Sequence, residues 1–273
     1  MWKQLKRKPL GLLGAGIIGV VIFTAIFANW LAPYDPYKID LKTRLKPPSW
    51  QHLFGTDKLG RDILSRVIYG TRISLQISSI VVVLAFPIGT IIGAFAGFTG
   101  SLADEIIMRI TDVFLSIPGL VLAMAIAAAL GPSIQNVILA LAVVWWTWYA
   151  RLSRSSVLQV KEFEYVEAAK AIGNSNMRLI FRHILPNCLA PVMVNATLDF
   201  GFVTLSAAGL SFIGLGAQPP SAEWGAMLSQ SREILREAWW ATMFPGFAIL
   251  FTVLGFNLLG DALRDIFDPR LKE

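Results

Sequence analysis

Six long apolar runs constrain this chain more than any other feature, because about 20 apolar residues cross roughly 30 Å of hydrocarbon as a helix. Charged residues make up 15% of the sequence, well below the roughly 25% of soluble domains. The sequence therefore predicts an all-α integral membrane protein with six transmembrane helices. The predicted spans are residues 10–31, 73–99, 109–130, 133–150, 187–212 and 238–260.

Glycines recur inside the first two runs. Residues 14–19 match the GxGxxG pattern of dinucleotide-binding loops, but that motif needs a preceding strand, and a basic tail stands here instead. Glycines in a membrane helix let two helix backbones approach closely, which explains this segment better. Gly89, Gly93 and Gly97 repeat every four residues. They predict one tightly packed helix face, within the subunit or across a dimer.

Local breaks are predicted around the second and third spans. Pro87 and Pro118 predict kinks inside them, and residues 100–108 predict a short turn between them. The polar segment 61–72 predicts an amphipathic helix with two possible positions. It lies on the membrane surface or packs under other residues of the 32–72 loop.

A strongly basic segment, residues 151–186, separates the fourth and fifth spans. Residues 162–172 within it predict a helix, because Glu, Ala and Lys are good helix formers. Gly173 ends this helix, since glycine adopts the left-handed cap conformation without strain. Residues 174–185 predict a second short helix that stops at Pro186.

The first of these helices has a distinctive face. Tyr165, Ala168, Ala169 and Ile172 follow the i, i+3, i+4, i+7 spacing and share one side of the helix, while Glu167 lies on the opposite side. The shared face is small at its centre, so a partner can approach closely. The spacing alone leaves two interpretations open, a docking segment and a merely solvated loop.

The same residues carry a resemblance to a known family. Glu167-Ala168-Ala169, then Gly173, then Ile184-Leu185-Pro186 is similar to the EAA loop of ABC importer permeases. In that family the loop forms coupling helices that dock into a cleft of the cytoplasmic ATPase subunit. The resemblance therefore implies an ATPase-coupling loop made by Glu167, Ala168, Ala169, Gly173, Leu185 and Pro186.

The remainder of the chain resembles the C-type permease of dipeptide and oligopeptide importers. The resemblance implies the type I ABC importer permease fold with an N-terminal part, residues 1–72, and a core permease domain, residues 73–273. The first part holds the tail, the first membrane helix and an external loop, and the second holds five membrane helices. The matching stretches are residues 52–57, 59–62, 65–66, 210–212, 214–216, 218–220, 223–225, 262–265 and 268–270.

Charge does not decide the orientation, because both the 151–186 loop and the 32–72 loop are basic. The resemblance implies that both termini and the 151–186 loop are cytoplasmic, in the inner or plasma membrane of a prokaryote. The partners it implies are a homologous second permease, two cytoplasmic ATPase subunits and an external solute-binding protein. The net charge of +6 does not require nucleic acid, because basic residues gather at the ends of membrane spans.

The chain carries no pattern for chemistry of its own. It has no GxxxxGK[ST] loop, so we expect no cofactor in this chain, with ATP and Mg²⁺ bound by the partner ATPases. His52 and His183 are predicted on opposite sides of the membrane, and no metal-ligand or hydrolytic pattern is present. We therefore expect a transport subunit and no enzyme. Cys188 is expected to be a buried structural residue.

Three functional questions stay open on the sequence. Peptides are the substrates that the resemblance favours, but related importers carry nickel, glutathione or oligosaccharides. A self-contained channel or secondary transporter is the alternative if the loop is merely solvated. Asp199 is the one acid well inside a predicted span, where an ionisable group is costly and usually functional. It predicts a translocation-path residue together with Asn195, or a packing residue hydrogen-bonded to Asn195.

Overall fold

The computed structural model describes residues 8–267 and thus omits most of the basic tail and the matching residues 268–270. The described chain is helical and forms no strand, which confirms the all-α prediction. The longer helices are α2 (Pro9–Ile26), α4 (Ile63–Thr99), α5 (Ser101–Leu115), α6 (Gly119–Leu130), α7 (Ile134–Val160), α10 (Leu185–Phe212) and α12 (Trp240–Phe267). The shorter ones are α3 (Ala28–Leu31), η1 (Leu41–Thr43), α8 (Glu164–Ala171), α9 (Asn176–Arg178), η2 (Leu179–Ile184), α11 (Trp224–Ser231) and η3 (Arg232–Ile234).

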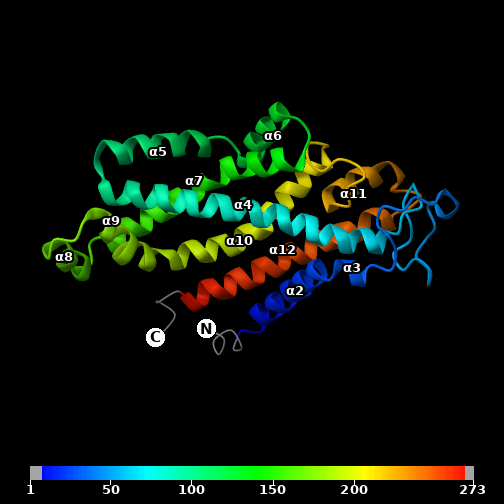
Figure 1. Ribbon diagram of the computed structural model, residues 1–273, viewed down its shortest axis with the longest axis horizontal. Helices are drawn as coiled ribbons and strands as arrows, with labels where there is room; N and C mark the ends of the chain where they lie inside the picture. Colours follow the sequence, from blue (N-terminus) through cyan, green and yellow to red (C-terminus); the bar gives the residue numbers. More distant parts are fainter. Residues whose placement is uncertain (1–7, 268–273) are drawn as a thin grey trace.

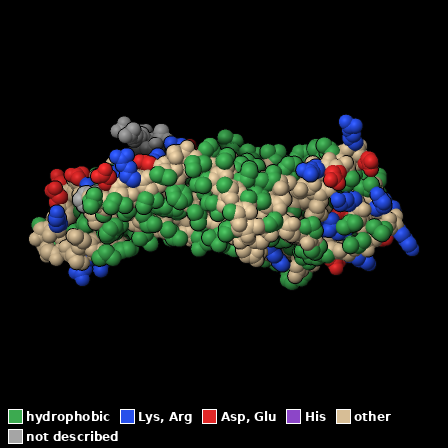
Figure 2. All heavy atoms as spheres, turned by 90° about the horizontal axis from the view of Figure 1, so that it is seen from above, with side chains coloured by type: hydrophobic (Ala, Val, Ile, Leu, Met, Phe, Trp, Pro, Cys, Tyr) green, Lys and Arg blue, Asp and Glu red, His purple; other side chains and the backbone are tan. Residues whose placement is uncertain are grey.

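The helices α4, α7, α10 and α12 run along the longest axis of an elongated bundle (Figure 1). Figure 2 shows hydrophobic side chains over the middle of the molecule and charged side chains gathered at its two ends. Because hydrocarbon excludes charged groups, this distribution fits a bundle that spans a membrane. Four helices within the described range are long and apolar enough to cross it, and a bent pair, α5 with α6, makes a fifth candidate.

The third predicted span is broken in two. The helix axes bend by 86° between residue 115 and residue 119, a much larger change than the kink predicted at Pro118. The turn predicted over residues 100–108 is wrong, because the chain reverses at Gly100 alone, with φ +60°. Helix α5 therefore starts directly after α4, at Ser101.

The segment 61–72 packs against the chain itself, and the surface-helix alternative is wrong. Its residues form the first turns of α4, where Asp62 accepts a hydrogen bond from the Ser65 backbone N–H at 2.8 Å. Arg66 is 1% exposed and donates to the carbonyl oxygens of Pro36 and Ser221, each at 3.1 Å. The second span thus continues a helix that begins at Ile63.

The glycines of α4 pack against α7, which contains the fourth predicted span. A Cβ added to Gly89 would lie 2.2 Å from the Trp146 carbonyl oxygen. This confirms the predicted tight contact and places it within the subunit. On α2, a Cβ on Gly14 would lie 2.7 Å from the Leu259 nitrogen of α12, so this glycine serves helix packing.

The two ends of the described chain lie near each other. Lys8, before α2, forms an ion pair with Asp265, near the end of α12. The segment between α3 and α4 lies at the end of the bundle opposite α8 (Figure 1). The predicted topology requires this separation between the 32–72 loop and the 151–186 loop.

Candidate functional site

The segment between α7 and α10 protrudes at one end of the bundle (Figure 1). Its first helix, α8, covers Glu164–Ala171 and is shorter than the predicted 162–172. Gly173 has φ +85°, and its N–H donates to the Lys170 carbonyl at 3.0 Å. The Asn174 side-chain amide also donates to the Ala169 carbonyl at 2.8 Å. The glycine therefore ends α8 in the predicted left-handed conformation.

Helix α8 turns one side to the bundle and the other outward. Val166 is 4% exposed and packs in a cluster with residues of α4, α7, η2 and α10. Tyr165 and Ile172 are 42% and 82% exposed, and Ala168 is exposed as well. Ala169 is 6% exposed, so its predicted place on the open face is wrong. It lies one turn from Val166 on the inner side, which holds α8 down on the bundle.

The second helix does not end at Pro186, and that prediction is wrong. Helix α9 continues through the π-helical turn η2 into α10, which begins at Leu185. Pro186 sits directly after this turn, in the first turn of α10. The wider turn before it shifts the backbone hydrogen bonds by one residue. Leu185 and Pro186 therefore join the protruding segment to the fifth span without an interruption.

A cavity of about 830 Å³ opens between the end of α4 and α8. Side chains of both charges line it, namely Lys161, Glu162, Glu167 and Lys170. Together with the outward side of α8, this end of the bundle presents apolar groups and both charges to a partner. A polar rim around apolar contacts is typical of protein–protein interfaces.

Two family models match the chain. The model described as "Binding-protein-dependent transport system inner membrane component" covers residues 89–273. The model described as "N-terminal TM domain of oligopeptide transport permease C" covers residues 1–48. The chain belongs to this family of transport permeases.

Individual relatives match the permease over nearly its whole length. It is 52% identical to the probable D,D-dipeptide transport system permease protein DdpC of Escherichia coli (strain K12), over 98% of this chain and 90% of the relative. It is 49% identical to the dipeptide transport system permease protein DppC of Alkalihalophilus pseudofirmus, over 99% and 89%. A solved chain of the inward-facing MetNI methionine ABC transporter superposes with a TM-score of 0.61 at 20% identity, over 76% of the permease and 98% of that chain. The permease therefore has the type I ABC importer permease fold.

The two candidate path residues of the permease, Asn195 and Asp199, have different surroundings on α10. The Asn195 side chain donates to the Pro191 carbonyl at 3.2 Å, not to Asp199. It lines a cavity of about 420 Å³ between α7, α10 and α12, which Arg264 also lines. Asp199 instead lies beside Trp145 and Tyr149 of α7. The structure therefore does not join the two residues in one polar site.

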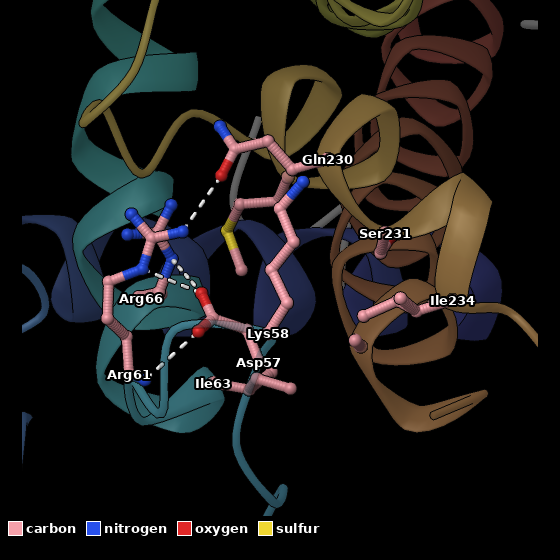
Figure 3. Close-up of a pocket in the computed structure, with 10 residues that line it drawn as sticks. Asp57, Lys58, Arg61, Ile63, Arg66, Gln230, Ser231 and Ile234 are labelled. Atoms are coloured by element: carbon pink, nitrogen blue, oxygen red, sulfur yellow. Dashed lines mark hydrogen bonds and ion pairs between the residues drawn. The ribbon is translucent and has the colours of Figure 1, made fainter. Parts of the chain in front are cut away.

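A buried polar cluster, for which the sequence patterns predict no role, lies at the opposite end of the permease (Figure 3). Arg61 Nε donates to Asp57 Oδ2 at 2.7 Å, and Arg61 Nη2 donates to Gln230 Oε1 of α11 at 2.9 Å. Figure 3 shows the Arg66 guanidinium turned toward the same carboxylate, with Nε 3.9 Å from Asp57 Oδ2. The cluster fastens the segment before α4 to α11. Its residues lie in a matching stretch, but the partner Gln230 is 169 positions away.

Glu223 organises α11 in the same region. Its two carboxylate oxygens accept hydrogen bonds from the N–H groups of Gly225 and Ala226, at 2.9 and 2.8 Å. The residue is 1% exposed, and burial raises the pKa of its carboxyl group above the usual value, against the opposing effect of these bonds. Glu223 is therefore the N-cap of α11 and a buried acid outside the membrane spans.

Proposed function

We propose that this permease is the transmembrane subunit of an ATP-driven importer of di- and oligopeptides. In this proposal the 151–186 segment couples ATP hydrolysis by partner subunits to movement of the membrane helices. One observation carries it: α8 protrudes between α7 and α10, and after the Gly173 cap α9 continues through η2 into α10 without a break. A displacement of α8 would therefore move both α7 and α10. The peptide substrate is supported by two relatives at 52% and 49% identity, which are named as a D,D-dipeptide and a dipeptide transport permease.

The geometry supports a direct route from α8 into the membrane. ATPase closure would push on the exposed side of α8, which carries Glu167 and Ala168. Val166 and Ala169 would pass the push to the bundle, because both are buried beneath the helix. The continuous helix from α9 into α10 would shift with them and open the path toward an external binding protein.

The permease performs no chemistry of its own in this proposal. Two cytoplasmic ATPase subunits bind ATP and Mg²⁺, a homologous second permease completes the path, and an external solute-binding protein delivers the substrate. Both termini and the coupling loop face the cytoplasm across the inner or plasma membrane. The neighbouring ends of α2 and α12 support the placement of both termini on one side of the membrane.

Reconstitution tests the proposal. The permease is purified with its second permease and the ATPases, placed in proteoliposomes and supplied with a loaded binding protein and a radiolabelled dipeptide. We expect a stable complex and uptake that requires both ATP and the binding protein. Uptake by the permease alone would establish a channel or secondary transporter instead. Competition by nickel, glutathione or an oligosaccharide, in place of unlabelled dipeptide, would identify a different substrate.

A further inference from the structure

Helix α5 lies along the half of α7 that leads into α8 (Figure 1), yet few of its side chains are buried. Leu102, Ile106 and Val113 are 69%, 51% and 64% exposed. Thr111 is the buried side chain of this helix among those described. Helix α5 therefore lacks the close backbone contact that joins α4 to α7, and other contacts must hold it.

Two ion pairs join α5 to α7. Asp104 pairs with Arg154, and Asp112 pairs with Arg151. The Asp104–Arg154 pair is bidentate, since Arg154 Nε and Nη2 donate to the two carboxylate oxygens, each at 2.6 Å. The planar guanidinium fork fixes direction as well as distance. The Arg154 and Asp104 side chains are 32% and 13% exposed, against 48% and 56% for Arg151 and Asp112, and exposed pairs contribute little.

Arg154 stands close to the start of the coupling segment. Helix α7 ends at Val160, six residues or about 9 Å of helix later. On its other side, this part of α7 is fixed to α4. Ser153 Oγ donates to the Thr90 carbonyl at 2.8 Å, and a Cβ on Gly97 would lie 2.9 Å from the Arg154 carbonyl oxygen. A displacement that enters from α8 therefore reaches Arg154 through rigidly packed helix.

Helix α5 continues into α6 through the 86° bend after residue 115. Helix α6 is held differently, because Ala123 and Ala127 are buried in an apolar cluster with Val137 and Leu141 of α7. Ion pairs and the Phe114–Trp146 ring contact thus hold α5 on α7, apolar packing holds α6, and residues 116–118 form a joint between them. The Pro118 ring removes a backbone hydrogen bond at this joint.

We propose that Asp104 and Arg154 are positioning residues for transport, which make α5 follow α7 when the coupling segment is displaced. Residues 116–118 absorb the resulting change of angle relative to α6. The inference rests on the proposed function of α8 as the coupling element. Without the bidentate pair, α5 lags behind α7, and ATP is hydrolysed with less substrate moved for each ATP.

The test measures dipeptide transported per ATP hydrolysed by the assembled complex in proteoliposomes, together with complex yield and thermal midpoint. Arg154→Gln should lower this ratio at least about threefold, since it removes the charge and the fork. The double variant Asp104→Arg with Arg154→Asp should recover much of the loss, because it rebuilds an attractive pair. Arg109→Gln on α5 is the control, because its exposed pair with Glu105 lies within that helix, and its ratio should stay within about 1.5-fold of the unchanged permease.

Specific outcomes would overturn the inference. If uptake and ATP hydrolysis by Arg154→Gln fall together in proportion to complex yield, the pair is merely structural. If Arg154→Gln does not assemble, Arg154→Lys keeps the charge without the fork, and an unchanged ratio there overturns the inference equally. The Gly173→Val variant distinguishes a failure of this inference from a failure of the proposed function. If Gly173→Val leaves the transport-to-ATP ratio unchanged, the proposed coupling loop is wrong. If Gly173→Val lowers this ratio and Arg154→Gln leaves it unchanged, only the role of the ion pair is wrong.

Discussion

Gly93 of α4 lies directly against the backbone of Ala150 on α7. A Cβ on residue 93 would be 2.0 Å from the Ala150 carbonyl oxygen. No side-chain rotation relieves such a contact, because the oxygen belongs to the backbone. One turn earlier, Gly89 meets the Trp146 carbonyl in the same way. This seam joins the middle of the bundle to the part of α7 that leads into the coupling segment.

Gly93→Ala should therefore destabilise the permease by about 1–3 kcal/mol, the usual cost of overpacking. The measurement is the thermal midpoint of the purified complex and its yield. Gly16→Ala on α2 is the matched control, since a Cβ there meets nothing within 4 Å. Equal midpoints for the two variants would contradict the α4–α7 seam.

The parts of the fold that were predicted correctly depend on local signals. The Gly173 cap follows from one residue and its conformational freedom. The seam glycines follow from a four-residue repeat, although the sequence did not say which helix they meet. Four of the six predicted spans, those in α2, α4, α10 and α12, follow from apolar length.

The parts that were not predicted depend on contacts between distant positions. Arg66 is buried at the start of α4 because its hydrogen-bond acceptors, Pro36 and Ser221, lie 30 and 155 positions away. A local pattern therefore left two positions open for its segment, the membrane surface and a packed position under the 32–72 loop. The helix continues through Pro186 because a π-helical turn precedes it. A proline in the sequence does not by itself predict such a turn. The Asp104–Arg154 pair joins residues that are 50 positions apart. No local pattern predicts that α5 lies alongside α7.

Gly173→Val should uncouple ATP hydrolysis from transport while the permease still inserts and assembles. A β-branched residue is strained at φ +85°, so the end of α8 must rearrange. Gly173→Asn is the control, since asparagine tolerates the left-handed region. The measurement is stimulation of ATPase activity by loaded binding protein. Full stimulation in the valine variant would count against α8 as the coupling element.

Glu167→Lys reverses an exposed charge on the α8 side of the 830 Å³ cavity. Because the side chain is exposed, we expect normal insertion and a reduced contact with the ATPase subunits. Glu167→Gln keeps the size and removes the charge, and should fall between Glu167→Lys and the unchanged permease. Complex yield after detergent washing reports the contact. Identical yields for all three proteins would contradict this role.

The two ends of the bundle should lie on opposite sides of the membrane. Single cysteines at Lys42 and Ser175, both exposed positions, are introduced with Cys188→Ala. An impermeant maleimide added to intact spheroplasts should label the residue 42 variant and spare the residue 175 variant. Disrupted membranes provide the control, in which both are labelled. Labelling of both in intact cells would overturn the predicted topology.

Glu223 should make stability depend on pH. Burial raises its folded pKa above the ordinary glutamate value of 4.5, so the folded state holds the proton more tightly than the unfolded state. This contribution is complete below the unfolded pKa and is lost as pH rises through the folded pKa. The thermal midpoint of the unchanged permease should fall more than that of Glu223→Gln between about pH 5 and pH 8. Parallel curves would contradict the shift.

Asp199 places an ionisable group inside the fifth predicted span. An unpaired carboxylate at the bilayer centre costs at least about 2.5 kcal/mol on insertion scales, so its surroundings must compensate. The neighbouring side chains Trp145 and Tyr149 offer a structural compensation, and a water-filled path offers a functional one. A peptide brings an N-terminal ammonium, which a carboxylate in the path attracts without holding it tightly.

On the path hypothesis, Asp199→Asn keeps the shape, removes the charge, and lowers dipeptide uptake per assembled complex. Tyr149→Phe is the matched variant, because it removes one hydroxyl beside the same carboxyl group and leaves the charge in place. Uptake and detergent-stable complex yield are measured in the same preparations. A path residue gives reduced uptake at normal yield in Asp199→Asn and near-normal uptake in Tyr149→Phe. If both variants instead lose yield in proportion to uptake, Asp199 holds α10 to α7 and does not act on the substrate.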